Sequence, residues 1–419
     1  MRDAAAIAAP AVASPPLGIG RVWVFLCGVS IAGSGFSAGR LAIGGFLVHP
    51  IVVAAAVAFP VLLAQRARQI PPRLAAAMVC FAAAYGLAMF TNGEFYHPPV
   101  VKIVSTLMII LTTSLLVQSE ADRTAGTVGL MLGVSILALH GLFIGGLGNE
   151  TFSVLKDASG NKNAFSLYAL PTMLVGGALV LRRGTSLPVR LVVGGGWVLL
   201  ALTIFLSANR SGWAGVVVVG LALFVGSGRR RLGTVTGLAV GGGLTYLVMT
   251  TWFDTGVFER RWAQTVEGYA SDDLREELFV ECFKLGLENP VLGVGQRLDY
   301  ELAKRVSDHS FELIGPHNAL TALFGLGGLV LVTAWLALGR QLWVIGKGLK
   351  ETGQRFSLMH LLVALWLFRA AFADETMYSP TFAMCFGLLI GAARLKATPV
   401  VRRARVVVAP PRQAVLSPS

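Results

Sequence analysis

The residues best suited to chemistry are a histidine and an asparagine, His317 and Asn318, which directly follow a Gly-Pro pair and precede a long apolar run. Histidine is the usual general base for activating a hydroxyl group, because its charge changes near neutral pH. A histidine at the mouth of a helix is more often structural than catalytic, so its surroundings must decide. His309 lies nearby in sequence and is a rival for the same role.

Two arginines could bind an anion. Arg210 lies in "FLSANRSGWAG", where Ser207, Asn209 and Ser211 form a polar group at the start of an apolar run. The start of a helix favours anions through its free N–H groups and its dipole. The alternative is an arginine that extends along the membrane surface and binds nothing in particular.

Arg275 lies in "SDDLREELFVECFKLGLENP", which predicts a helix that is capped by Ser271 and stopped by Pro290. At 100° per residue, an apolar arc is expected to contain Arg275; its members are Leu274, Leu278, Cys282 and Leu285, extended by Phe279, Val280, Phe283 and Leu287. An arginine within an apolar arc needs a partner. That partner is an anionic ligand or an acid such as Glu276. For Arg369, in "WLFRAAFADE", the nearby Asp374 or Glu375 predicts a structural ion pair.

The composition places these residues in a membrane protein. Of 419 residues, 55% are hydrophobic and 14% charged, and the mean hydropathy is +0.69. We expect an all-α fold of about twelve membrane spans, with one large periplasmic loop that carries short helices. The predicted spans are 21–38, 41–64, 74–91, 101–118, 124–147, 164–181, 191–208, 211–227, 232–252, 317–345, 356–373 and 380–396.

The basic residues predict the orientation. Most of the 35 lie in short segments on one side of the spans, together with only four acids, Asp3, Glu120, Asp122 and Glu351. The positive-inside rule therefore places both termini in the cytoplasm. The net charge of +13 follows from this arrangement, and no nucleic-acid partner is expected because no binding motif accompanies it.

The domain organisation follows from these spans. We expect a flexible cytoplasmic N-terminus (1–20), one transmembrane domain (21–396) and a disordered cytoplasmic tail (397–419). The long segment 253–316 becomes the periplasmic loop, and loops of this length are usually functional. No metal site or cofactor is expected, because the four cysteines form no ligand pattern and Asp272-Asp273 suits a helix start.

Four segments carry a family resemblance: "SGNKNAFSLYALP" (159–171), "SANRSGWAG" (207–215), "RRWAQTVEGYASDDLREELFVECFKLGLENPVLGVG" (260–295) and "GPHNALTALFGLGG" (315–328). In order and placement around one external loop, the chain resembles the O-antigen ligase superfamily over roughly residues 150 to 330. The resemblance implies a glycosyltransferase of the Gram-negative inner membrane. Its donor would be a glycan on undecaprenyl diphosphate, and its acceptor the lipid A–core oligosaccharide.

By motif, the resemblance implies that Arg210 and Arg275 bind the diphosphate and that His317 is the catalytic base of an inverting, metal-independent transfer. Asn318 and Arg297 are supporting candidates, although Arg297 stands in "GVGQR", which departs from the more usual small or prolyl residues there. An O-antigen polymerase or a protein O-oligosaccharyltransferase would use the same donor. A polysaccharide transporter or flippase is a more distant alternative, although no internal repeat is evident.

Overall fold

Apolar helices form most of the structure, as the sequence predicts. The computed structural model describes residues 17–34, 41–43, 46–90, 97–144, 162–207, 209–227, 231–252, 263, 270–306, 317–350 and 354–397. The longer helices are α1 (Leu17–Val29), α2 (Pro50–Arg66), α3 (Pro72–Phe90), α4 (His97–Leu116), α5 (Glu120–Ile144), α7 (Lys162–Val180), α8 (Leu187–Leu206), α9 (Arg210–Gly226), α10 (Arg231–Trp252), α12 (Ala270–Glu288), α13 (Leu298–Arg305), α14 (Ala319–Gly348), α15 (Leu358–Ala370) and α16 (Pro380–Ala397). Short 3₁₀ turns are η1 (Ser30–Ser34), η2 (Ala67–Gln69), η5 (Gly295–Arg297) and η7 (Asp374–Tyr378).

The helices form a bundle of potential membrane spans. Among the described residues, seven helices are long and apolar enough to cross a bilayer: α2 with η2, α3, α5, α8, α10, α14 and α16. Shorter apolar helices coincide with α1, α4, α7, α9 and α15. These helices fall on the spans predicted from the sequence, while the number of crossings stays a prediction. Most of segments 1–20 and 397–419 lies outside the described residues.

One predicted span begins later than expected. Residues Leu41–Ile43 (β1) and Phe46–Val48 (β2) pair as a short antiparallel hairpin, with Leu41 opposite Val48. The helix α2 starts only at Pro50, whose ring suits the first turn of a helix. The prediction of a helical span from residue 41 is therefore wrong, and the Gly44-Gly45 pair between the two strands is the sequence signal that was missed.

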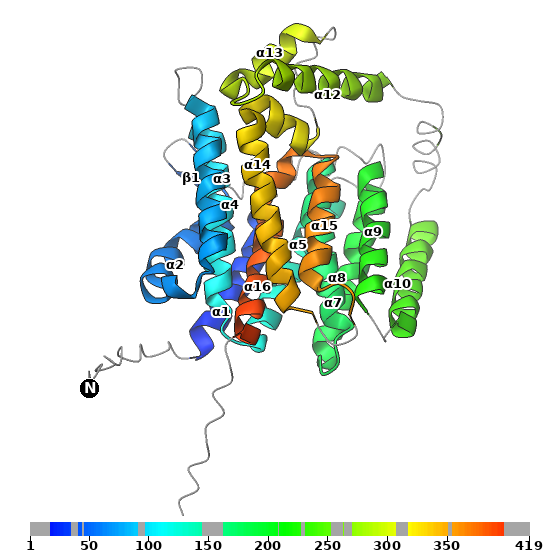
Figure 1. The fold of residues 1–419 in the computed structure, drawn as a ribbon. Coiled ribbons are helices and arrows are strands. Elements are labelled where there is room, and N and C mark those ends of the chain that lie inside the picture. Colours follow the sequence, from blue (N-terminus) through cyan, green and yellow to red (C-terminus); the bar gives the residue numbers. More distant parts are fainter. Residues whose placement is uncertain are drawn as a thin grey trace, which may run out of the picture.

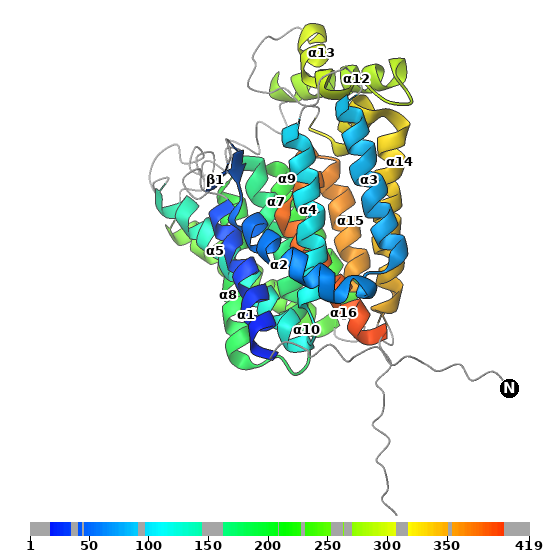
Figure 2. The same ribbon diagram turned by 90° about the vertical axis from the view of Figure 1, so that its left-hand side faces the viewer.

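Helix α12 lies across one end of the bundle, above α14 and α15, with α13 beside it (Figures 1 and 2). It begins at Ala270, so Ser271 lies in its first turn and not at the predicted cap. The predicted apolar side is buried at Leu278, Cys282 and Leu285. The residues predicted to extend this apolar surface are partly exposed, with Phe279, Phe283 and Leu287 at 41%, 46% and 58%. Among the described residues, α12 packs against α14 and α13.

At the end of the bundle opposite α12, basic side chains donate hydrogen bonds to the last carbonyl groups of helices. Arg394 in α16 donates to the carbonyl of Val117 at 2.6 Å, and Arg66 donates to that of Leu115 at 2.8 Å, just at the end of α4. Lys396 donates to the carbonyl of Leu349, at the end of α14. Cations stabilise the last carbonyls of a helix. The residues that predict the cytoplasmic side therefore lie far from α12.

Helix α14 is interrupted at Gly328, which has φ 59° and ψ −156°. A second segment supplies the missing backbone bonds. The Leu329 N–H donates to the carbonyl of Pro290 at 2.8 Å, and the Val294 N–H donates to that of Gly325 at 2.8 Å. Irregular backbone within a membrane helix is tolerated where other protein groups satisfy it. Backbone hydrogen bonds thus connect the "ENPVLGVG" segment (288–295) to the "ALFGLGG" segment (322–328). We call this connection the joint; the sequence did not predict it.

Substitution of Gly328 by alanine is expected to prevent this joint from forming. Its backbone conformation is accessible essentially only to glycine, and it costs other residues about 1–3 kcal/mol. A Cβ atom there would also lie 2.4 Å from the backbone carbonyl carbon of Val291. Detergent-extracted Gly328→Ala should therefore show a large loss of folded protein and a lower Tm. The matched control is Gly348→Ala, where a Cβ meets no atom within 4 Å. Equal Tm values for the two variants would mean that the joint does not require glycine at position 328.

Candidate functional site

The first turn of α9 is fixed by hydrogen bonds around Arg210. Asn209 caps the helix, because its side-chain oxygen accepts from the Gly212 N–H at 3.2 Å and from the Ser211 hydroxyl at 2.8 Å. The Asn209 amide donates to the Ser166 hydroxyl of α7 at 3.2 Å. Asn209 is buried and Arg210 is half-buried. The polar group predicted from the sequence therefore positions Arg210 as the first residue of a capped helix.

Arg369, near the end of α15, reaches this same turn. Its side chain is 0% exposed, and its guanidinium donates to the Ser211 hydroxyl at 2.9 Å. The predicted partners were Asp374 or Glu375, whose side chains lie outside the described residues. The contact with Ser211 was not predicted, since the two residues are far apart in the sequence.

His317 and Asn318 lie at the start of α14, as predicted. Asn318 caps that helix by accepting from the Thr321 N–H at 3.0 Å and from the Thr321 hydroxyl at 3.1 Å. Its amide donates to the Ala371 carbonyl at 3.2 Å, at the end of α15. These bonds give Asn318 a structural role, and its expected support of the imidazole or substrate stays a prediction. The rival His309 and the Gly315-Pro316 pair lie outside the described residues.

The backbone at His317 is in the left-handed region, with φ 47°. Among the described residues it is the one non-glycine residue with positive φ. Such a conformation is uncommon, and histidine adopts it more often than most residues do. Conformations of this kind gather at functional sites, where the surrounding structure imposes them. The half-buried side chain of His317 is thus held by the turn that leads into α14.

The end of α15 brings the two helix starts together. Arg369 contacts the first turn of α9, and Ala371, two residues later, contacts the cap of α14. Arg210 and His317 therefore lie at the same end of the bundle, although they are distant in the sequence. Figure 1 shows α9, α14 and α15 ending on the side where α12 lies.

Arg275 stands on α12, which packs against the first turns of α14. The Cys282 thiol donates to the Thr321 carbonyl at 3.3 Å, and the rings of Phe283 and Phe324 lie 5.5 Å apart between centroids. Arg275 precedes Cys282 by seven residues, or two turns, so both point to the same side of α12. Arg275 is half-buried. Its helix thus faces the end of the bundle that carries Arg210 and His317.

Arg297 ends the 3₁₀ turn η5, between α12 and α13, and its side chain is exposed. Its supporting role stays a prediction. Nearby, Arg305 of α13 donates to both carboxylate oxygens of Glu288 at 2.8 and 2.6 Å. This hydrogen bond lowers the pKa of Glu288. The pair is therefore ionised at neutral pH and ties α13 to α12.

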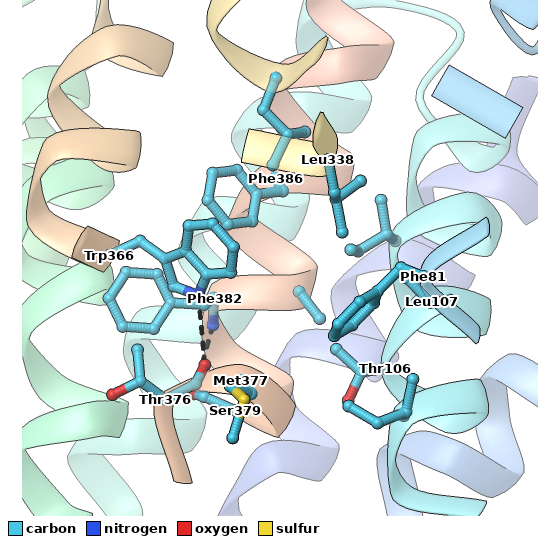
Figure 3. A pocket seen from close by; sticks show the side chains of 14 residues that line it. Phe81, Thr106, Leu107, Leu338, Trp366, Thr376, Met377, Ser379, Phe382 and Phe386 are labelled. Carbon is cyan, nitrogen blue, oxygen red and sulfur yellow. Dashed lines mark hydrogen bonds between the residues drawn. The ribbon is translucent and has the colours of Figure 1, made fainter. Parts of the chain in front are cut away.

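A small cavity lies within the bundle between α3, α4, α14, α15, η7 and α16 (Figure 3). Its volume is about 20 Å³, and aromatic rings from Phe81, Trp366, Phe382 and Phe386 line it. A space of this size holds about one water molecule. The indole of Trp366 donates to the Thr376 carbonyl at 3.2 Å, which holds η7 against α15. A cavity of this size is too small for a glycan.

One comparison with known proteins identifies this region. Residues 195–336 match a family model described as O-antigen ligase. This segment is similar to the O-antigen ligases. The matched segment contains Arg210, Arg275 and His317, and it ends before Arg369. A search of curated proteins finds no match to the chain. The resemblance predicted from the motifs is thus confirmed over about a third of the sequence, which includes the joint between α14 and the segment after α12.

Proposed function

We propose that this protein transfers O-antigen polysaccharide from undecaprenyl diphosphate to a sugar of the lipid A–core oligosaccharide, at the periplasmic face of the inner membrane. The supporting observation is that two arginines and a histidine from separate motifs of an O-antigen ligase family segment gather at one end of an apolar bundle. A lipid-linked donor presents its diphosphate at such a membrane surface, while a sugar acceptor approaches from water.

The arginines are suited to the diphosphate. Each guanidinium offers a planar pair of N–H donors that matches phosphate oxygens, and partial burial strengthens the attraction. Arg210 adds its charge to the N-terminus of α9, where the helix dipole also favours an anion. As the glycosidic bond breaks, these charges stabilise the departing diphosphate. The proposed reaction needs no metal ion.

His317 is proposed as the general base. Its neutral imidazole takes the proton of the acceptor hydroxyl, whose oxygen attacks the anomeric carbon of the donor sugar. The new carbon–oxygen bond forms as the bond to the diphosphate breaks, and the bonding electrons leave with undecaprenyl diphosphate. Because attack occurs opposite the leaving group in a single displacement, the anomeric configuration inverts.

The orientation can be tested by cysteine labelling in intact cells and membrane vesicles. We expect Ser271→Cys on α12 to react with impermeant reagents from the periplasm, and Arg230→Cys to react only from the cytoplasm. The physical reason is the gathering of basic residues at the end away from α12. If Ser271→Cys were labelled from the cytoplasm alone, α12 would lie on the cytoplasmic side of the membrane. The proposed transfer at the periplasmic face would then be overturned.

A deletion strain tests ligase against polymerase activity. If the protein is a ligase, the strain should accumulate long lipid-linked polysaccharide and show lipopolysaccharide with a bare core. Loss of a polymerase would instead leave cores that carry a single repeat unit. Complementation with the wild-type chain is the control, and it should restore the long lipopolysaccharide ladder.

A further inference from the structure

Arg369 is a fully buried cation in a mostly apolar helix, "LMHLLVALWLFRA". Burial of a charge is costly in a membrane protein, and intramembrane charges are usually tied to function or held by partners. Its guanidinium donates to the Ser211 hydroxyl at 2.9 Å. This residue lies outside the segment that matches the O-antigen ligase family, so the motifs assign it no role.

The contact with Ser211 is the first of a series of bonds around Arg210. Ser211 donates in turn to Asn209 at 2.8 Å, and the same Asn209 oxygen accepts from the Gly212 N–H. Arg210 stands between Asn209 and Ser211 in the chain. Both sequence neighbours of Arg210 therefore belong to the series that Arg369 starts, and α15 acts directly on the turn that carries Arg210.

We propose that Arg369 is a positioning residue for the diphosphate site: it fixes the first turn of α9 so that Arg210 is held in its binding orientation. This inference rests on the proposed function. It requires no contact between Arg369 and the substrate. The same end of α15 also holds the cap of α14 through the Ala371 carbonyl, so it sets the relative position of the helices that carry Arg210 and His317.

The test is a double-mutant cycle on the affinity of the purified full-length protein for undecaprenyl diphosphate. Arg369→Met keeps an unbranched apolar side chain and removes the guanidinium, and we expect the Kd to rise about tenfold, as for coupled neighbours. In an Arg210→Ala background, the same change should have little further effect, because the residue through which it acts is gone. Ser211→Ala breaks the same link from the other side and should also raise the Kd.

The matched control is Arg394→Met, which removes a guanidinium bound to the Val117 carbonyl at the other end of the bundle. It should leave the Kd unchanged. If Arg369→Met is poorly folded, Ser211→Ala replaces it in the cycle, because that change leaves the bundle packing nearly intact.

The outcomes separate this inference from the proposed function. Independent, additive effects of the changes at positions 369 and 210 would overturn a positioning role through Arg210. If Ser211→Ala left the Kd unchanged while Arg210→Ala raised it, the positioning role of Arg369 would also be overturned. The proposed function would then stay in place. An unchanged Kd in Arg210→Ala would instead contradict the proposed diphosphate site itself.

Discussion

Replacement of His317 by asparagine is expected to lower glycan transfer by about 10²–10⁴-fold, the usual contribution of a general base. Asparagine is chosen because it tolerates the left-handed backbone that the structure shows at this position, with φ 47°. The variant should therefore keep the turn into α14 and the capping bonds of Asn318, yet it cannot accept a proton. Donor affinity should be nearly unchanged.

The pH profile of transfer gives the more specific readout. The wild-type rate should fall as the pH drops through the range in which histidine becomes protonated, since the base must be neutral. The residual rate of His317→Asn should lack this dependence. His309→Asn serves as the matched control for the rival histidine, and near-normal transfer is expected. Substantial turnover of His317→Asn with the wild-type pH profile would show that His317 is not the base.

Arg210→Ala and Arg275→Ala are each expected to lower transfer by about 30- to 1,000-fold, as for removal of one partner of a desolvated charge pair. The loss should appear as weaker binding of the donor as well as slower turnover, because the diphosphate is charged before and during bond cleavage. Lysine should restore little activity at either position, since an ammonium group lacks the planar pair of donors.

Membrane insertion and Tm of both alanine variants should be measured alongside transfer. The control is Arg305→Ala on α13, which breaks the paired contact with Glu288 near the same end of the bundle. Exposed ion pairs contribute little, so its transfer rate should stay close to that of the wild type. Near-normal activity of both Arg210→Ala and Arg275→Ala would mean that these arginines form structural ion pairs only.

The sequence predicted the parts of the site that depend on local pattern. Apolar periodicity indicated α12 and its buried residues Leu278, Cys282 and Leu285, and the polar residues around Arg210 indicated the start of α9. The position of His317 before an apolar run likewise indicated the mouth of α14. These features follow from residues close together in the chain, where helix periodicity and capping act.

Features that depend on distant contacts were not predicted. The break at Gly328 forms because the segment after α12 replaces the backbone bonds of α14, and the "GLGG" residues alone fit a continuous membrane helix as well. Arg369 was assigned to nearby acids, whose side chains lie outside the described residues. Its contact with Ser211 was not foreseen, because it depends on the packing of α15 against α9.

The proposed transfer can be measured with purified components in a reconstituted system. The purified protein would be mixed with a glycan on undecaprenyl diphosphate and lipid A–core acceptor, in the presence of a metal chelator and without an energy source. We expect glycosylated lipid A–core, release of undecaprenyl diphosphate and inversion at the anomeric carbon, all lost in His317→Asn. If folded protein forms no glycosylated lipid A–core, or elongates the lipid-linked glycan in its place, the proposed ligase activity is wrong.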